Sequence, residues 1–515
     1  MKFLNAGLLG TFASIVIGCA GAAAQESDLA KLTKVELDNK IVQARLESKG
    51  DPRAFCSAEL LVRELDRREP NSLVRAEAEY FAAICALVHN NVPAMWPHIR
   101  NAEALLPISG GGQLRIAVES LALDVAAGTK DSGNFAEHIV HVAAIDDSNV
   151  LAAINGERIF ANISALPPGV RDSAYLAFAE SPHFSNYPGY FRQAIAEFSV
   201  LPALERGNRA VALKMVQEVS DIDHFYPLLI DRRYQPIWPE IERRVGPHMS
   251  FVADDFVRFS KQELAEEPDN RWAFGDVVRS LVVAGRNREA IAIFQTLPKD
   301  PQSVAKYQPG DVWATNAAAV ALDREGRTAE ADEAYDRLTQ VSVETNPWML
   351  SLLNIRAGRL IDQERWVNAM AASKDHLAMA ERYGGPYQQS FAAANVICAA
   401  TRLQSDPLVE RANAILLLNS DKFPIAAAIA ALCRNDKITA HKLVLAALAS
   451  EDSRSLALIN MQPPGAYKLP VAMRSALPNL SDFVMGDPEL QAAFNRYGRI
   501  LPSELHLRLS TERKP

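Results

Sequence analysis

The chain is poor in aromatic residues and in positive charge. Aromatic residues make up 7% of the 515 positions, and 54 Lys and Arg stand against 62 Asp and Glu, which leaves a formal net charge of −8. Nucleic-acid binding needs a concentrated basic face, so this balance argues against a nucleic-acid partner. After the N-terminal segment no stretch approaches the roughly 18 uninterrupted apolar residues that span a bilayer, so we expect no transmembrane span in the mature chain.

Catalytic and cofactor motifs are also missing. The sequence contains no nucleophile elbow, phosphate loop, zincin helix or dinucleotide fingerprint. His138 and His141 would share one helix face, with Asp146 and Asp147 nearby. Two histidines at a helix packing face explain that spacing more simply than a metal does. We therefore expect a protein that is not an enzyme, with no catalytic residues, no metal and no cofactor.

The first 25 residues have the pattern of an export signal. A cation at Lys2 precedes an apolar run over residues 6–17, and small residues at 22–24 precede Gln25. Residues 16–19 also resemble a lipobox, in which case Cys19 would become the acylated first residue. The two alternatives place the mature chain free in the periplasm, or attached by a lipid anchor to the outer membrane and facing the periplasm.

Four cysteines follow the signal, an even number in a compartment that permits disulfides. Cys56 and Cys85 flank a turn near residues 70–72 at similar distances, so in an antiparallel helical hairpin they predict a disulfide, with two buried free thiols as the alternative. Cys398 and Cys433 would occupy equivalent positions in neighbouring repeats. Helix axes about 8 to 10 Å apart make that second bridge harder to form.

The hydrophobic pattern predicts an all-α protein. From Leu29 onward, apolar residues recur at helical spacing between short breaks that contain Pro, Gly, Asn or Asp, and no period-2 strand pattern stands out. Several expected helix starts carry Asp followed by Pro, as at residues 51–52, 406–407 and 487–488. This punctuation is typical of many short helices.

A repeat is clearest near the middle of the chain. Residues 285–290 are echoed 41 residues later by residues 326–331, and the matching positions in each copy are a Gly at the turn, a small residue and an aromatic: Gly285, Ala290 and Phe294, then Gly326, Ala331 and Tyr335. This pattern resembles the tetratricopeptide repeat, a helix-turn-helix unit with a small residue where its two helices cross. The resemblance implies an α-solenoid or superhelix that holds a protein or peptide partner.

The organisation we expect is an N-terminal signal over 1–25, a helical array over 26–250, tetratricopeptide-like repeats over 251–450 and a capping region over 451–515. The join near residue 250 rests on residues 229–238 and 487–497. Both resemble the short Asp-x-x-aromatic helices that close bacterial helical arrays.

The aromatic stretch 175–191 is the candidate recognition surface, because tyrosine offers a rigid contact area with a polar tip. The expected function is a non-catalytic periplasmic or outer-membrane-associated scaffold for protein–protein interaction. The alternative is an envelope carbohydrate-binding protein or enzyme whose site is assembled around this stretch. Rings that merely plug a gap between repeats would also explain the candidate partner-binding residues Tyr175, Tyr187, Tyr190 and Phe191.

Overall fold

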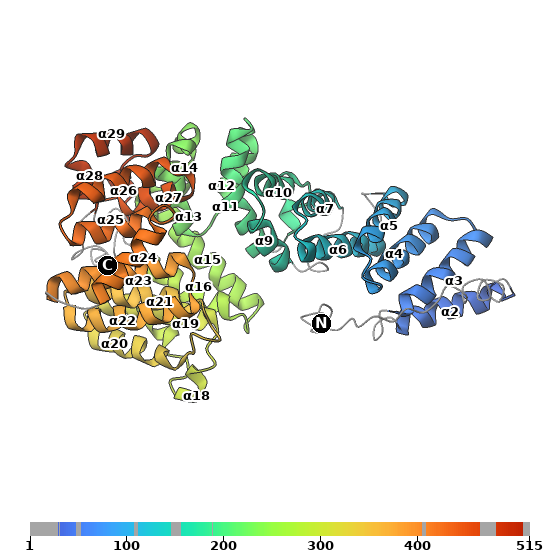
Figure 1. The fold of residues 1–515 in the computed structure, drawn as a ribbon, viewed down its shortest axis with the longest axis horizontal. Helices are drawn as coiled ribbons and strands as arrows, with labels where there is room; N and C mark the ends of the chain where they lie inside the picture. Colours follow the sequence, from blue (N-terminus) through green and yellow to red (C-terminus); the bar gives the residue numbers. More distant parts are fainter. Residues whose placement is uncertain are drawn as a thin grey trace. The chain divides into compact units, whose positions relative to one another are not determined.

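The computed structural model describes residues 29, 31–47, 53–107, 112–145, 156–187, 189–403, 408–463 and 480–507 (Figure 1). Within these ranges every regular element is a helix, and apart from one isolated bridge between Asp231 and Gly498 there is no β-pairing. The all-α prediction is therefore confirmed. None of the helices in this part of the chain is long and apolar enough to cross a bilayer. The predicted signal, Cys19, Asp146 and Asp147 lie outside the described residues.

The chain divides into two compact units, Met1–Pro202 and Ala203–Pro515. The sequence suggested a join near residue 250, but residues 222–249 pack with the C-terminal end of the second unit. The amide of Arg499 donates to the carbonyl of Ile230 at 2.9 Å, beside the Asp231–Gly498 bridge. The two segments that resemble array-closing helices thus contact each other.

In the first unit successive helices from α2 to α7 pack side by side, and α7 packs against α10 (Figure 1). The helices are α2 (Lys34–Glu47), α3 (Ala54–Arg68), α4 (Ser72–Val88), α5 (Val92–Leu105), α6 (Gly112–Thr129), α7 (Ser132–Ala144), α9 (Gly156–Ser164), α10 (Pro168–Glu180) and α11 (Gly189–Glu205), the last of which continues into the second unit.

The second unit brings its early and late helices together, because α13 packs against α27 and the short helix η2 (Arg232–Ile237) against α29. Its α-helices are α12 (Arg209–Glu218), α13 (Ile222–Ile230), α14 (Trp238–Val245), α15 (Ser250–Glu266), α16 (Arg271–Val283), α17 (Asn287–Phe294), α18 (Pro301–Val304), α19 (Pro309–Arg324), α20 (Thr328–Arg337), α21 (Met349–Asp362), α22 (Trp366–Tyr383), α23 (Pro386–Leu403), α24 (Leu408–Asn419), α25 (Pro424–Cys433), α26 (Lys437–Ala449), α27 (Glu451–Asn460), α28 (Leu480–Met485) and α29 (Pro488–Tyr497).

One turn geometry recurs along the described part of the chain. A residue with positive φ ends a helix, and the amide of the next residue donates to the carbonyl five positions before it, at 2.8 to 3.0 Å. This is the Schellman arrangement, which satisfies a carbonyl that the helix leaves free. Successive turns of this kind are separated by 38 to 41 residues, or by 71 to 78 residues, which is roughly twice that interval. The positive-φ residues are Asn90, Lys130, Gly207, Gly285, Gly326, Glu364 and Asn435.

The positions after each of these turns are buried in the same way. The fifth residue after the positive-φ residue is Ala290, Ala331 or Ala369 in three successive copies, and all three are inaccessible to solvent. The ninth residue is Phe294 or Tyr335 in two of them and is also buried. A small residue lets the two helices of a hairpin approach, and the larger ring fills the space beside the contact.

Candidate functional site

The aromatic stretch of the first unit lies in the interior. Tyr175 is 1% exposed, Tyr187 3% and Phe191 1%. The Tyr187 hydroxyl donates to Ser181 Oγ at 3.0 Å, and its ring stands edge-on to Phe191 with centroids 5.8 Å apart. These three side chains therefore do not form the exposed recognition surface that the sequence suggested. The side chain of Tyr190 lies outside the described part.

Four arginines lie beside the two clearest repeats, and each contacts a carboxylate of the chain. Arg271 bonds Asp311, and Arg279 donates to both oxygens of Asp221 at 2.8 Å. Similar pairs join Arg286 to Glu289 and Arg288 to Glu325.

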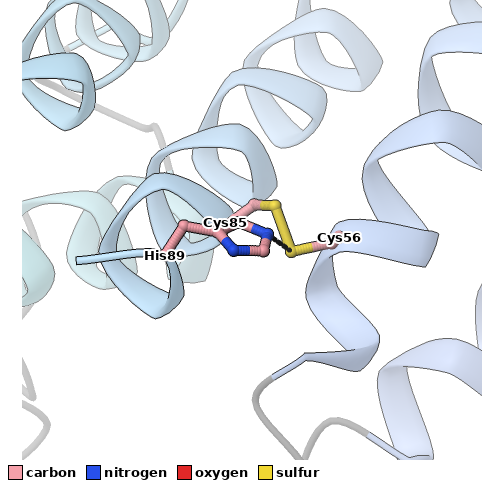
Figure 2. A group of neighbouring side chains, drawn as sticks. All are labelled: Cys56, Cys85 and His89. Carbon is pink, nitrogen blue, oxygen red and sulfur yellow. Dashed lines mark hydrogen bonds between the residues drawn. A yellow bond between two sulfur atoms is a disulfide. The ribbon is translucent and has the colours of Figure 1, made fainter. Parts of the chain in front are cut away.

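Both cysteine pairs lie at disulfide distance. Cys56 on α3 and Cys85 on α4 have Cα atoms 5.0 Å apart, and the sulfurs are joined as Figure 2 shows. His89, just after α4, places Nε2 3.8 Å from Cys56 Sγ. Sulfurs joined in a disulfide offer no thiolate to a metal, so this trio is not a metal site while oxidised.

The second pair, Cys398 and Cys433, was the harder one to predict. It joins α23 and α25 with Cα atoms 5.1 Å apart. Both helices carry runs of buried alanine, which let them approach more closely than helices with large side chains do. The close approach brings the two cysteines within reach of each other.

A buried polar cluster lies where α5, α6 and α7 meet. Glu103 comes from α5, Glu119 from α6, and His138 and His141 from α7. His138 Nδ1 is 2.8 Å from Glu119 Oε2 and 3.1 Å from Glu103 Oε1. His141 Nδ1 is 3.1 Å from the same Glu103 oxygen and 3.4 Å from Glu119 Oε1. The histidines three residues apart thus face two glutamates from neighbouring helices.

Arg115 completes the cluster from the same helix as Glu119. Its Nη2 is 2.5 Å from Glu119 Oε1, and its Nη1 donates to the carbonyls of Glu103 and Leu106 at 3.3 Å each. The side chains of Arg115 and His138 are 3% exposed and that of Glu119 is fully enclosed. Charges this deep require compensation by neighbours, and each of them has it.

The glutamates set the protonation of the histidines. Burial opposes the charge of His138, but its hydrogen bonds to Glu103 and Glu119 outweigh burial and raise its pKa to about 9. Hydrogen bonds to the same glutamates also raise the pKa of His141 to about 9. For Glu103, burial is outweighed by hydrogen bonds from both histidines, which hold its pKa well below the usual range. The two histidines therefore carry protons at neutral pH, and the cluster is a network of buried ion pairs.

The preceding helical hairpin, which consists of α4 and α5, carries a partial copy of this cluster 40 residues earlier in the sequence. Glu79 and His98 stand at the positions of Glu119 and His138, with His98 Nδ1 2.7 Å from Glu79 Oε2. Arg63, at the position of Glu103, contacts Glu79 at 3.3 Å. Asn101, at the position of His141, donates to Glu79 at 3.3 Å. The first copy is thus one glutamate and one histidine short of the second.

The sequence held a signal for this duplication. An Arg followed four residues later by Glu occurs at 75 and 79 and again at 115 and 119, and a His-Ile pair occurs at 98–99 and again at 138–139. The shared offset identifies which glutamate belongs with which histidine. Spacing within one helix could not do so, because the glutamates come from neighbouring helices.

A hollow of about 520 Å³ lies in the second unit between α26 and α28. Its lining includes two basic, two acidic and two apolar residues: Lys437, Lys442, Asp482, Asp487, Ile438 and Phe483. Ile438 is 74% exposed. The hollow therefore combines charges of both signs with an exposed apolar contact.

Comparisons with known proteins assign no family to the chain, since no protein-family model, curated protein or solved structure matches it.

Proposed function

We propose that the chain is a non-catalytic scaffold of tetratricopeptide-like repeats, arranged as a superhelix, that binds a protein or peptide partner in the bacterial envelope. The recurring turn carries this proposal, because the same hydrogen bond closes seven of the described helices, at intervals near 40 residues or about twice that. Helical hairpins that repeat at a fixed interval stack on their neighbours and build extended surfaces for partners.

The cysteines support export. Two pairs at disulfide distance suit an oxidising compartment such as the periplasm. We propose that the mature chain begins at Gln25, free in the periplasm, or at an acylated Cys19 on the outer membrane. Mass spectrometry of the protein purified from its own envelope measures this directly. Recovery of a chain that still begins at Met1 would contradict export.

We place the partner contact at the hollow between α26 and α28. Lys437 and Lys442 lie with Asp482 and Asp487 around the exposed Ile438, which suits a peptide that carries one apolar anchor and charges of both signs. A small apolar contact surrounded by charge is typical of interfaces that are made and broken rather than permanent.

A photo-crosslinking amino acid at position 438 tests this placement. Val367 supplies the control, because it occupies the same place relative to its turn and is 71% exposed. We expect one reproducible partner to be captured from position 438 and not from position 367. With that partner purified, Ile438→Asp should weaken binding at least ~10-fold while Val367→Asp should not. Equal binding by both variants would place the contact elsewhere, and recovery of no reproducible partner from the full chain would count against the scaffold itself.

A further inference from the structure

We propose that Glu103, Glu119, His138 and His141 bind one divalent transition-metal ion of the Zn²⁺ class, a property beyond the scaffold function. Each residue turns one ligand atom toward the others, and these four atoms all lie within 4.8 Å of one another. They come from three consecutive helices, so the fold itself assembles the set.

The spacing of the ligand atoms fits a tetrahedral ion. Zinc–ligand bonds of about 2.0–2.1 Å place neighbouring ligand atoms of a tetrahedron about 3.3 Å apart. The contacts between imidazole nitrogens and carboxylate oxygens run from 2.8 to 3.4 Å and involve both oxygens of Glu119. The four ligand atoms, one from each residue, lie within 4.8 Å of one another, so an ion at the centre would draw the most distant of them together.

The ligand types select the class of ion. Two imidazole nitrogens with two carboxylate oxygens suit zinc and neighbouring divalent transition metals. Magnesium and calcium prefer sets made of oxygen alone, with more ligands than four. Glu119 and His138 are buried, so they shield the proposed ion from solvent on their side. Such shielding is typical of a structural metal ion.

Glu119 is held in place for coordination. Its Oε2 lies 2.8 Å from His138 Nδ1, and its Oε1 lies 2.5 Å from the Arg115 guanidinium and 3.4 Å from His141 Nδ1. Arg115 is itself fixed by two backbone carbonyls, so it acts as a support for the ligand and does not occupy the centre.

The preceding hairpin provides a comparison within the same chain. It repeats the glutamate–histidine pair as Glu79 and His98 but carries Arg63 and Asn101 where the proposed site has Glu103 and His141. One glutamate with one histidine is too few ligands to hold zinc, and neither Arg63 nor Asn101 supplies a further one. The first hairpin should therefore bind none.

The test uses the full mature protein, stripped with EDTA and titrated with Zn²⁺ by calorimetry. We expect one site in the wild type. His141→Asn installs the residue that the first hairpin carries at the same place, so the hairpin frame tolerates it. Loss of a direct ligand should weaken zinc binding by more than the ~10-fold typical of lost supporting contacts. His98→Asn, the matched change in the first hairpin, should leave binding unchanged.

A second readout keeps the test independent of folding. Trp96 stacks on His138 with ring centroids 5.8 Å apart. In protein labelled with fluorotryptophan, zinc should shift the fluorine resonance of Trp96 in the wild type and in His98→Asn but not in His141→Asn or Glu103→Gln. Cobalt bound in the same place should give the intense visible absorption of a tetrahedral ion. Absence of zinc binding by the wild type, or equal binding by all four proteins, would overturn the proposal.

Discussion

Two successive helix interfaces in the first unit are held together in different ways. A disulfide between Cys56 and Cys85 joins α3 to α4. Forty residues later Trp96 and Val125 stand at the positions of those cysteines, and the buried glutamate–histidine cluster joins α5, α6 and α7 instead. The same hairpin frame thus accepts a covalent link at one interface and an ionic one at the next. Whichever link is present, it ties a helix to its neighbour in the adjacent hairpin.

Removing the buried carboxylate should have the largest effect. Glu119→Ala leaves the enclosed Arg115 and His138 without their partner, and breaking such a pair costs about 3–5 kcal/mol. Trp96 is the one tryptophan of residues 1–202, so its fluorine resonance reports on this unit during urea unfolding. Glu79→Ala is the matched change in the first hairpin and should cost only about 1 kcal/mol, because Arg63 and His98 are 41% and 32% exposed. Equal losses in the free energy of unfolding would mean that the two clusters stabilise the first unit equally.

Removing the covalent link should cost nearly as much. The Cys56–Cys85 disulfide closes a loop of 29 residues, and releasing a loop of that size costs about 3–4 kcal/mol in the chain-entropy account. We expect Cys56→Ala with Cys85→Ala to lower the urea midpoint of the first unit by a corresponding amount. Dithiothreitol should lower the wild-type midpoint but leave that of the double variant unchanged. A midpoint insensitive to both treatments would contradict a stabilising disulfide here.

Alkaline pH should loosen the second interface and spare the first. The pKa of both His138 and His141 is about 9 in the folded chain, against about 6.5 when unfolded. A raised folded pKa gives stability that is complete below pH 6.5 and is lost as the pH rises through 9. In EDTA we expect the first unit to lose on the order of 2–3 kcal/mol across that window. His141→Asn should flatten the loss, and an unchanged slope in that variant would show that the histidines are not responsible.

Substitutions in the turns of the two hairpins should have the smallest effect on stability. Lys130 and Asn90 both have positive φ, a conformation that asparagine tolerates better than lysine. We therefore expect Lys130→Gly to stabilise the first unit by about 0.5–1 kcal/mol and Asn90→Gly by less. Thermal unfolding of the two variants side by side measures this. Destabilisation by Lys130→Gly would show that the lysine side chain has a role beyond the turn.

Much of the fold could be predicted from the sequence because helix punctuation is local. Gly285 and Gly326 mark turns by a conformation that glycine adopts readily, and Ala290 and Ala331 mark helix contacts by their size. Where Lys130 takes the positive φ, the residue type carries no such signal, so that turn could not be recognised.

The cluster was harder to predict because its members are far apart in sequence. His138 and His141 were visible as a pair on one helix face, but their partners Glu103 and Glu119 come from two other helices. The aromatic stretch shows the opposite difficulty. Tyr175 and Tyr187 have the chemistry of a recognition surface, and only their burial reveals that they fill the interior. Residue type alone does not distinguish the two roles of tyrosine.

The most direct test of this account counts zinc ions per chain in three proteins by native mass spectrometry. The wild type should hold one, His141→Asn none, and Arg63→Glu with Asn101→His two, because that double change gives the first hairpin the ligands of the second. The same count in all three proteins would contradict the claim that these two positions separate an ion pair from a metal site.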